Sequence, residues 1–436
     1  LNSSVLTASL IMYLTNVLLV VAACWAYVEA AKVVCYWDGR SFHREGAAKI
    51  TVEDIKPGLS YCTHLIYGYA GIDEHEYVLE HLDPDLVLDG GKRQYRAVTE
   101  LKKAYPGLVI SLAIGGFGDN DDLDKYLTLA EKESQRIKFV NSVRQILNEY
   151  DFDGIDLVWR FPEVKEKKEK GTLGTIWAGI KSVFKSTDEH VDQHREQFVV
   201  LLRELKAALT PKLVTLGVLP HINATAYFDV RNFIQNVDFI NLWSFDYRTP
   251  KRTKKLADHS HPLYYVYDRN PQQNVDAQVK WWLEQGTPTS KLIVGIPTFG
   301  RSWELTTDSG KSGVPPLIAD GAGDEGPYTK IDGTLAYYET CTRLVSPTNS
   351  KAPANLLRRV PDPNQRLGSY AYRLPIGDVE GFWLSFEEPE TAKTKAAYAK
   401  QRGLAGVALV DMSMDDPRGS CDGTKFPILR SAKINS

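Results

Sequence analysis

Short hydrophobic runs alternate with longer amphipathic segments along most of the chain. Eight of these runs are continuous enough to predict strands buried on both faces, as in parallel sheets. They are Val33–Trp37, His64–Ile72, Val109–Gly116, Ile155–Trp159, Val214–Leu219, Phe239–Phe245, Leu292–Phe299 and Val407–Met412. Helical spacing between them predicts helices at Gln135–Tyr150, Arg195–Leu209, Val275–Gln285 and Glu390–Arg402. The alternation predicts an α/β fold, a closed (β/α)8 TIM barrel.

One interval interrupts this alternation. It runs from about Trp303 to Glu380, between the seventh and eighth predicted strands, and is rich in glycine, proline and tyrosine. An interval of that length exceeds an ordinary loop and indicates an inserted subdomain. We therefore predict a barrel formed by residues 31–303 and 381–436, with the insertion at 304–380.

Two further segments follow the carboxyl ends of predicted strands, where a barrel builds its cleft. Residues 163–192 begin with the charged run EVKEKKEKG and contain an apolar patch, Ile176–Phe184, that we expect to pack on the barrel. The run Arg248–Leu256 carries five basic residues. A hydrated loop is the simpler interpretation of both charged runs. The alternative for the first is a segment that covers or flanks the cleft, and for the second a site that binds sulfated glycans or an acidic receptor face.

The first 30 residues have the features of a secretory signal peptide. An apolar run, Val17–Ala26, precedes small residues, so we expect the mature chain to begin at Ala31. The first methionine is Met12, and residues 1–11 are interpreted as lying outside the natural signal. The apolar run is shorter than the about 20 residues that a membrane span needs. We predict a secreted, extracellular protein without a membrane span.

Composition and cysteine content fit that compartment. The chain is 43% hydrophobic and can bury a large core, and its formal net charge of −3 gives no reason to expect nucleic acid. Cys35, Cys62, Cys341 and Cys421 remain after signal removal and predict two disulfide bonds, in any of three pairings. The alternative, a zinc site, lacks closely spaced ligand pairs, and no cofactor or metal is predicted. Asn223 begins a sequon for N-glycosylation.

The segment Asp151–Pro162, which reads DFDGIDLVWRFP, carries the most specific chemical pattern. Side chains alternate along a strand, so Asp156, Val158 and Arg160 are predicted to share one face. Trp159 lies on the other face, where a core role is expected.

This segment resembles the signature of glycoside hydrolase family 18, the chitinases, whose pattern is DGxDxDxE followed by an aromatic residue and a proline. The matching residues are Asp153, Gly154, Asp156 and Pro162. Val158 occupies the position of the family's third aspartate, and Arg160 that of its acid glutamate. The resemblance implies a small α+β domain between strands seven and eight, and the disulfide bonds Cys35–Cys62 and Cys341–Cys421.

The resemblance also implies roles for the replaced residues. In that family the sugar's 2-acetamido group attacks its own anomeric carbon, the glutamate protonates the leaving oxygen, and the aspartate orients the acetamido group. Arg160 cannot act as that acid at neutral pH, because a guanidinium keeps its proton in proteins. Val158 has no group to hold the acetamide. We expect Arg160 to form an ion pair with Asp156 or Asp246 across the barrel mouth.

Other positions of the implied site either fit the family or depart from it. The residues that fit, and that are candidates for carbohydrate binding, are Tyr36, Trp243, Asp246 and Trp303. Phe245 lacks the hydroxyl of the family's tyrosine, and Val410 replaces the tryptophan that lies under the sugar at the cleavage point. The aspartates interpreted as fold supports at the barrel mouth are Asp153, Asp156 and Asp246.

The lost carboxylates, the charged insertion and the cysteines together resemble the imaginal disc growth factors, secreted chitinase-like proteins of insects. The resemblance implies a protein without hydrolase activity that promotes cell proliferation, motility or shape change through a cell-surface receptor or matrix component. The alternative is a lectin that binds chitin or another N-acetylglucosamine oligomer without cleaving it. A weak hydrolase would need a relocated acid, for which the sequence offers no candidate.

Overall fold

The computed structural model describes residues 31–119, 122–163, 188–344 and 356–436. One compact unit extends from Lys32 to Ser436. The predicted signal peptide, residues 1–30, and the apolar patch Ile176–Phe184 lie outside the described residues.

Eight parallel strands close into a barrel, each at the position of one predicted run. Their order is β1-β16-β9-β7-β6-β5-β4-β2, and β2 pairs with β1 to complete the ring. The strands are β1 (Lys32–Asp38), β2 (His64–Ile72), β4 (Val109–Gly115), β5 (Gly154–Val158), β6 (Leu213–Val218), β7 (Ile240–Leu242), β9 (Leu292–Pro297) and β16 (Gly406–Val410). A short strand, β3 (Leu79–Glu80), pairs antiparallel with the end of β2. The predicted TIM barrel is confirmed.

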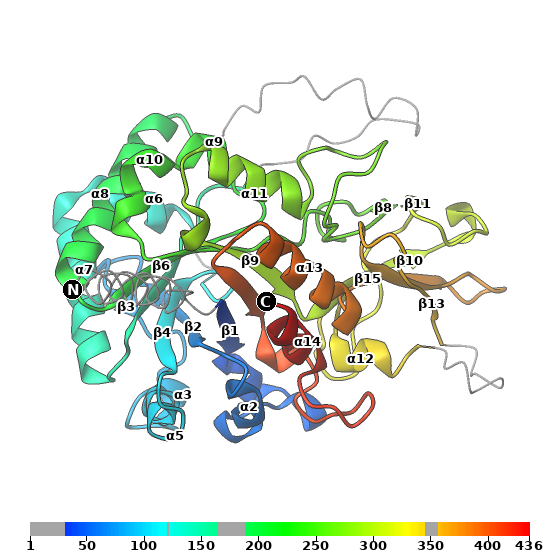
Figure 1. Cartoon of the computed structure of the whole chain (residues 1–436), viewed down its shortest axis with the longest axis horizontal. Helices are drawn as coiled ribbons and strands as arrows, with labels where there is room; N and C mark the ends of the chain where they lie inside the picture. The colour runs from blue at the N-terminus through cyan, green and yellow to red at the C-terminus, as the bar shows by residue number, and fades with distance from the viewer. Residues whose placement is uncertain (1–30, 120–121, 164–187, 345–355) are drawn as a thin grey trace, which may run out of the picture. The chain divides into compact units, whose positions relative to one another are not determined.

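Helices connect the strands and lie outside the barrel (Figure 1). The helices before β6 are α2 (Val52–Leu59), α3 (Pro84–Val87), α4 (Gln94–Thr99), α5 (Leu101–Ala104), α6 (Asp124–Glu131), α7 (Glu133–Glu149) and α8 (Val191–Leu209). Those after it are α9 (Ala224–Tyr227), α10 (Val230–Phe233), α11 (Val275–Glu284), α12 (Tyr337–Cys341), α13 (Pro389–Gln401) and α14 (Pro427–Asn435). The four predicted helices correspond to α7, α8, α11 and α13, with ends shifted by at most four residues.

The alternation of side chains along β5 separates two hydrophobic cores. Leu157 and Trp159 belong to the core between the strands and the surrounding helices, where Trp159 packs edge-on against Tyr126 with ring centroids 4.9 Å apart. Val158 belongs to a second core inside the barrel. The predicted division of faces and the core role of Trp159 are therefore confirmed.

A second, antiparallel sheet lies between β9 and β16 in the sequence, with strand order β12-β10-β15-β14-β13. Its strands are β10 (Phe299–Leu305), β12 (Thr334–Ala336), β13 (Arg358–Val360), β14 (Ser369–Arg373) and β15 (Gly381–Phe386). With α12 it forms the α+β insertion, which lies at one side of the barrel in Figure 1. The sheet extends beyond the predicted boundaries of 304–380, because β10 and β15 pair with each other along its centre.

Two disulfide bonds join segments that are distant in sequence. They are Cys35–Cys62 and Cys341–Cys421, the pairing that the resemblance implies. The first ties β1 to the segment before β2, and the second ties α12 of the insertion to the segment before α14. In the part of the chain that the structure describes, no helix is long and apolar enough to cross a membrane.

Candidate functional site

Asp156 lies on β5 inside the barrel and is completely buried. Its carboxylate accepts hydrogen bonds from the Tyr36 hydroxyl at 2.6 Å, the Thr215 hydroxyl at 2.6 Å and the Asn241 amide at 2.9 Å. Burial raises the pKa of Asp156, and these three donors act in the opposite direction. Donors from β1, β6 and β7 thus satisfy a buried carboxylate, as a fold support requires.

Asp153 lies at the other end of the barrel. It precedes β5, and its carboxylate accepts from the backbone N–H of Ile110 at 2.8 Å and pairs with Lys102 at 3.0 Å. The expectation that Asp153 supports the barrel mouth is wrong, because the mouth lies at the carboxyl ends of the strands. Asp153 still supports the fold, but it does so at the end of the barrel opposite the mouth.

Asp246 follows β7 at the mouth and is held by Arg301 of β10. The guanidinium donates to both carboxylate oxygens, at 2.8 and 2.5 Å, in a bidentate pair. Arg301 also donates to the hydroxyl of Thr334. The pair joins the barrel mouth to the insertion sheet. Asp246 is therefore a structural support at the barrel mouth, as predicted.

Arg160 is buried, with only 6% of its surface exposed, and it does not form the predicted ion pair. Its Nη1 donates to the backbone carbonyl of Gly116 at 2.6 Å and to that of Asp119 at 3.3 Å. Its Nη2 lies 3.9 Å from Glu163. The predicted pairing with Asp156 or Asp246 is therefore wrong, since these carboxylates have the partners described above.

The other substituted positions carry hydrocarbon inside the barrel. Val158 and Phe245 are fully buried, and Val410 at the end of β16 is 5% exposed. All three belong to one apolar cluster. At the positions where the resemblance implies an orienting acid, a hydroxyl and an aromatic platform, the structure thus offers no polar group and no tryptophan.

A group of aromatic rings fills the centre of the mouth. Trp243 is fully buried and packs edge-on against Tyr36 and nearly parallel to Phe245, with centroid distances of 5.4 and 5.7 Å. Phe117, from the loop after β4, lies 5.3 Å from Trp243. No feature of the sequence marks Phe117 as part of this group, because its position depends on how the loop after β4 folds.

Trp303 does not line this mouth. It is fully buried on β10 in a core of the insertion, 5.7 Å from Trp383, and its indole N–H donates to the carbonyl of Thr253 at 3.0 Å. The prediction that Trp303 binds carbohydrate is wrong, because its ring lies in a core of the insertion and not in the barrel mouth.

Two other titratable groups near the mouth were not identified from the sequence. Burial and the nearby arginines Arg252 and Arg301 lower the pKa of His221 to about 3, so its imidazole is neutral at physiological pH. Burial raises the pKa of Asp411, which directly follows β16 and accepts from the backbone N–H of Ser413 at 2.7 Å. The strand order places β16 across the barrel from β5, so Asp411 lies opposite position 160.

The basic run at 248–256 is only partly the hydrated loop that was expected. Its lysines are exposed, but Arg248 is mostly buried and pairs with Asp258. Arg252 has a 15% exposed side chain and lies 3.3 Å from Glu163. Both arginines therefore hold loops together at the rim.

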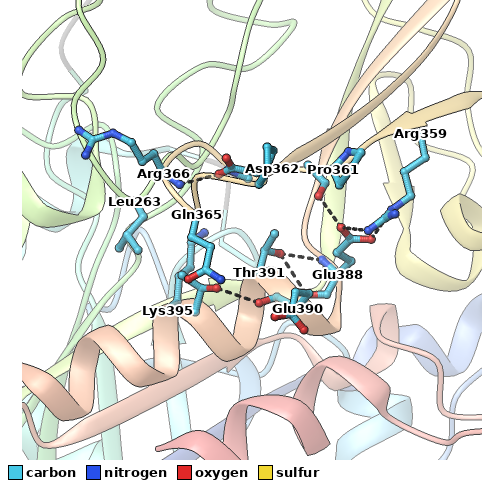
Figure 2. A pocket seen from close by; sticks show the side chains of 14 residues that line it. Leu263, Arg359, Pro361, Asp362, Gln365, Arg366, Glu388, Glu390, Thr391 and Lys395 are labelled. Carbon is cyan, nitrogen blue, oxygen red and sulfur yellow. Dashed lines mark hydrogen bonds and ion pairs between the residues drawn. The ribbon is translucent and has the colours of Figure 1, made fainter.

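A cavity of about 230 Å³ lies between α13 and the loop before β14 (Figure 2). Its polar walls are paired with one another: Arg359 forms a bidentate pair with Glu388 at 2.7 and 2.8 Å, and Ser369 donates to the same carboxylate. Lys395, also in the wall, pairs with the buried Glu387. None of the predicted site residues lines this cavity.

Asn223 of the sequon is the N-cap residue of α9. Its side-chain oxygen accepts from the N–H of Ala226 at 3.2 Å, and the residue is half-buried. This contact uses the oxygen and leaves the amide nitrogen, where a glycan is attached, outside the cap. Glycosylation of Asn223 stays a prediction.

The barrel, its insertion and the altered mouth define a chitinase-like protein. The sequence pattern of the glycosyl hydrolases family 18 matches residues 32–415. Chitinase-like relatives include Idgf4 of Drosophila melanogaster, which is 45% identical over 92% of this chain and 93% of its own. The chain therefore belongs to the glycosyl hydrolases of family 18 and, within them, to the chitinase-like proteins of the imaginal disc growth factor type.

Two solved structures show how far the likeness extends. Catalytic domain 2 of an Ostrinia furnacalis Group II chitinase, a mutant in complex with a chitin oligomer, has a TM-score of 0.77 and 29% identity over 93% of this chain and 96% of its own. Human YKL-39, a pseudo-chitinase with retained chitooligosaccharide binding, has a TM-score of 0.74 and 26% identity over 93% and 99% of the two chains. The same architecture thus supports cleavage in one protein and binding alone in another.

Proposed function

We propose that this protein is a secreted growth factor of the chitinase-like kind that promotes cell proliferation, motility or shape change and does not hydrolyse chitin. The observation that carries the proposal is the state of position 160. Where the family has its acid glutamate, Arg160 is buried and bound to the backbone carbonyls of Gly116 and Asp119. A group in that position can neither give up a proton at neutral pH nor move toward a substrate without breaking two hydrogen bonds.

Three further features support the absence of hydrolysis. Val158 offers no acceptor for the acetamido group, Phe245 no hydroxyl and Val410 no aromatic platform. Losing general acid catalysis alone costs about 10² to 10⁴ in rate, and the remaining losses add to it. The barrel itself is intact although the catalytic groups are replaced. This favours a function in which the surface of the folded protein binds a partner.

Two measurements test the proposal. Purified protein incubated with chitohexaose, analysed by mass spectrometry, should give no products above a buffer control, and measurable turnover would contradict the proposed absence of hydrolysis. If products form, Asp411→Asn decides whether the buried carboxyl across the barrel supplies the proton. Added to cultured insect cells, the protein should raise proliferation or motility in a dose-dependent way, and removing it with an antibody should abolish the effect.

A chitooligosaccharide-binding lectin is the second candidate. The likeness to YKL-39, a pseudo-chitinase with retained binding, favours it. Saturable binding of chitohexaose by wild-type protein, without cleavage and without any response of cells, would favour the lectin over the growth factor.

A further inference from the structure

We propose that the loops around Asp258 form a binding pocket for a sulfate or phosphate group, with a sulfated extracellular glycan as its source. The pocket lies between the segment after β7, the segment before α11 and the loop before β14. Its polar wall includes Tyr247, Arg248, Asp258, His259 and Arg269. None of the residues that support the proposed function lines this pocket, so the two proposals are independent.

The wall of the pocket carries more positive than negative charge. Arg248 and Arg269 both pair with the same oxygen, Oδ2 of Asp258, whose side chain is 1% exposed. Each guanidinium uses one nitrogen in this contact, whereas a bidentate pair would use two. Asp362 also acts electrostatically on His259, but its carboxylate accepts from backbone N–H groups of its own loop. Two largely buried cations that share one carboxylate favour a second anion beside them.

Two buried polar groups in the same wall have no hydrogen-bond partner among the described residues. They are the Tyr247 hydroxyl and Nδ1 of His259, on residues that are 4% and 7% exposed. Burial lowers the pKa of His259 to about 4, so its imidazole is neutral at physiological pH and can carry its proton on Nδ1. Because unpaired buried polar groups are costly, two of them in one wall indicate a ligand that accepts from both.

The pocket has room for such a group and lies at the surface. The centres of water-sized atoms can occupy about 30 Å³ of it, more than the about 10–15 Å³ that one water needs. Tyr265, in the same wall, is 40% exposed, so an anion attached to a longer molecule can enter. Lys251 and Lys254, on the segment that follows Arg248, are exposed and attract further negative charges. A sulfated glycan has this chemistry, and the predicted secretion would bring the protein to it.

Isothermal titration calorimetry on the purified secreted protein tests the proposal. The titrants are sodium sulfate, sodium phosphate, a heparin tetrasaccharide and the same tetrasaccharide after desulfation, all at one chloride concentration. We expect saturable binding of the two inorganic anions and at least about tenfold tighter binding of the tetrasaccharide, because its other sulfates meet the exposed lysines. The desulfated tetrasaccharide should not bind.

Three variants locate the site. Tyr247→Phe should weaken binding of sulfate and of the tetrasaccharide about tenfold, because hydrogen bonds to charged groups are strong. The lost hydroxyl has no partner in the protein, so without anion the variant should unfold at the same temperature as wild type or higher. Arg269→Gln removes one cation and should weaken binding further. Tyr267→Phe, at an 81% exposed tyrosine of the same segment, is the matched control and should bind like wild type.

Tyr247→Phe keeps every charge, so its loss of affinity separates a built site from general attraction between a polyanion and exposed lysines. Wild-type affinity in this variant would overturn the proposal, and so would the absence of saturable binding of all sulfated and phosphate titrants by wild type. Inorganic sulfate that binds as tightly as the tetrasaccharide would support the anion pocket and reject the glycan as its source. Chitin cleavage and the response of cells are measured separately, so these outcomes leave the proposed function as it stands.

Discussion

Returning the family's glutamate to position 160 should damage the protein rather than restore an enzyme. In Arg160→Glu, two hydrogen bonds from a charged donor to the carbonyls of Gly116 and Asp119 are lost. Bonds of this kind contribute about 1.5–3 kcal/mol each, which gives about 3–6 kcal/mol. The new carboxylate would also face two carbonyl oxygens in a position that is 6% exposed.

That loss is large beside the whole stability of a folded domain, about 5–15 kcal/mol. We expect Arg160→Glu to lower the midpoint of thermal unfolding by on the order of 10 °C. Arg160→Met is the matched control, because it removes the same hydrogen bonds and keeps an apolar side chain of similar length. It should be less destabilised than the glutamate variant, since it adds no buried charge.

Differential scanning calorimetry and chitohexaose cleavage, measured on the same preparations, decide the outcome. We expect no cleavage by either variant, because Val158, Phe245 and Val410 remain as they are. A glutamate variant as stable as wild type would show that the carbonyl contacts contribute little. Cleavage at a rate within tenfold of an active family 18 chitinase would show that position 160 alone was limiting, and would refute the reasoning.

Three further outcomes test the packing around the barrel. Replacing Cys341 and Cys421 with serine opens a loop of 80 residues and should cost about 4.5 kcal/mol by the chain-entropy relation, seen as a lower denaturation midpoint. Lys395→Met and Glu387→Gln should each destabilise by about 3–5 kcal/mol, and the double variant by less than their sum, in a double-mutant cycle. Burial raises the pKa of Asp415 from 3.8 to about 7, so the native state binds the extra proton and stability falls as pH rises between these values. Relative to Asp415→Asn, wild type should lose up to about 4 kcal/mol of unfolding free energy between pH 4 and 7. Parallel pH profiles for the two proteins would show that Asp415 does not cause this pH dependence.

The barrel strands could be predicted from the sequence because burial on both faces dictates continuous hydrophobic runs. All eight runs became strands, and the alternation in β5 separated Val158 from Trp159 as expected. The position of Asp153 could have been predicted as well. It precedes a strand, and the mouth of a barrel lies where strands end.

Other features of the site depend on contacts that the sequence does not display. The partner of Arg160 is a backbone carbonyl 44 residues away, and a backbone acceptor has no residue type that marks it. Trp303 was misplaced because a tryptophan just after a barrel strand has the same local pattern whether it enters a cleft or a second sheet. Its pairing with Trp383 across β10 and β15 decides the question, and only the fold brings those strands together.

The substitutions in the mouth depend on one another, which argues against restoring cleavage one residue at a time. A side chain added at Gly217 would meet Val158 at 2.8 Å and Asp156 at 3.0 Å, so the interior at β5 and β6 is already filled by the valine and the aspartate. Val158→Asp would place a second carboxylate beside Asp156, where burial already raises the pKa of the first. Trp243 packs nearly parallel to Phe245, so a polar group at position 245 would have to find a partner within an aromatic cluster. Each reversal thus encounters packing that suits the present residue, and a working mouth would require the whole set to change together.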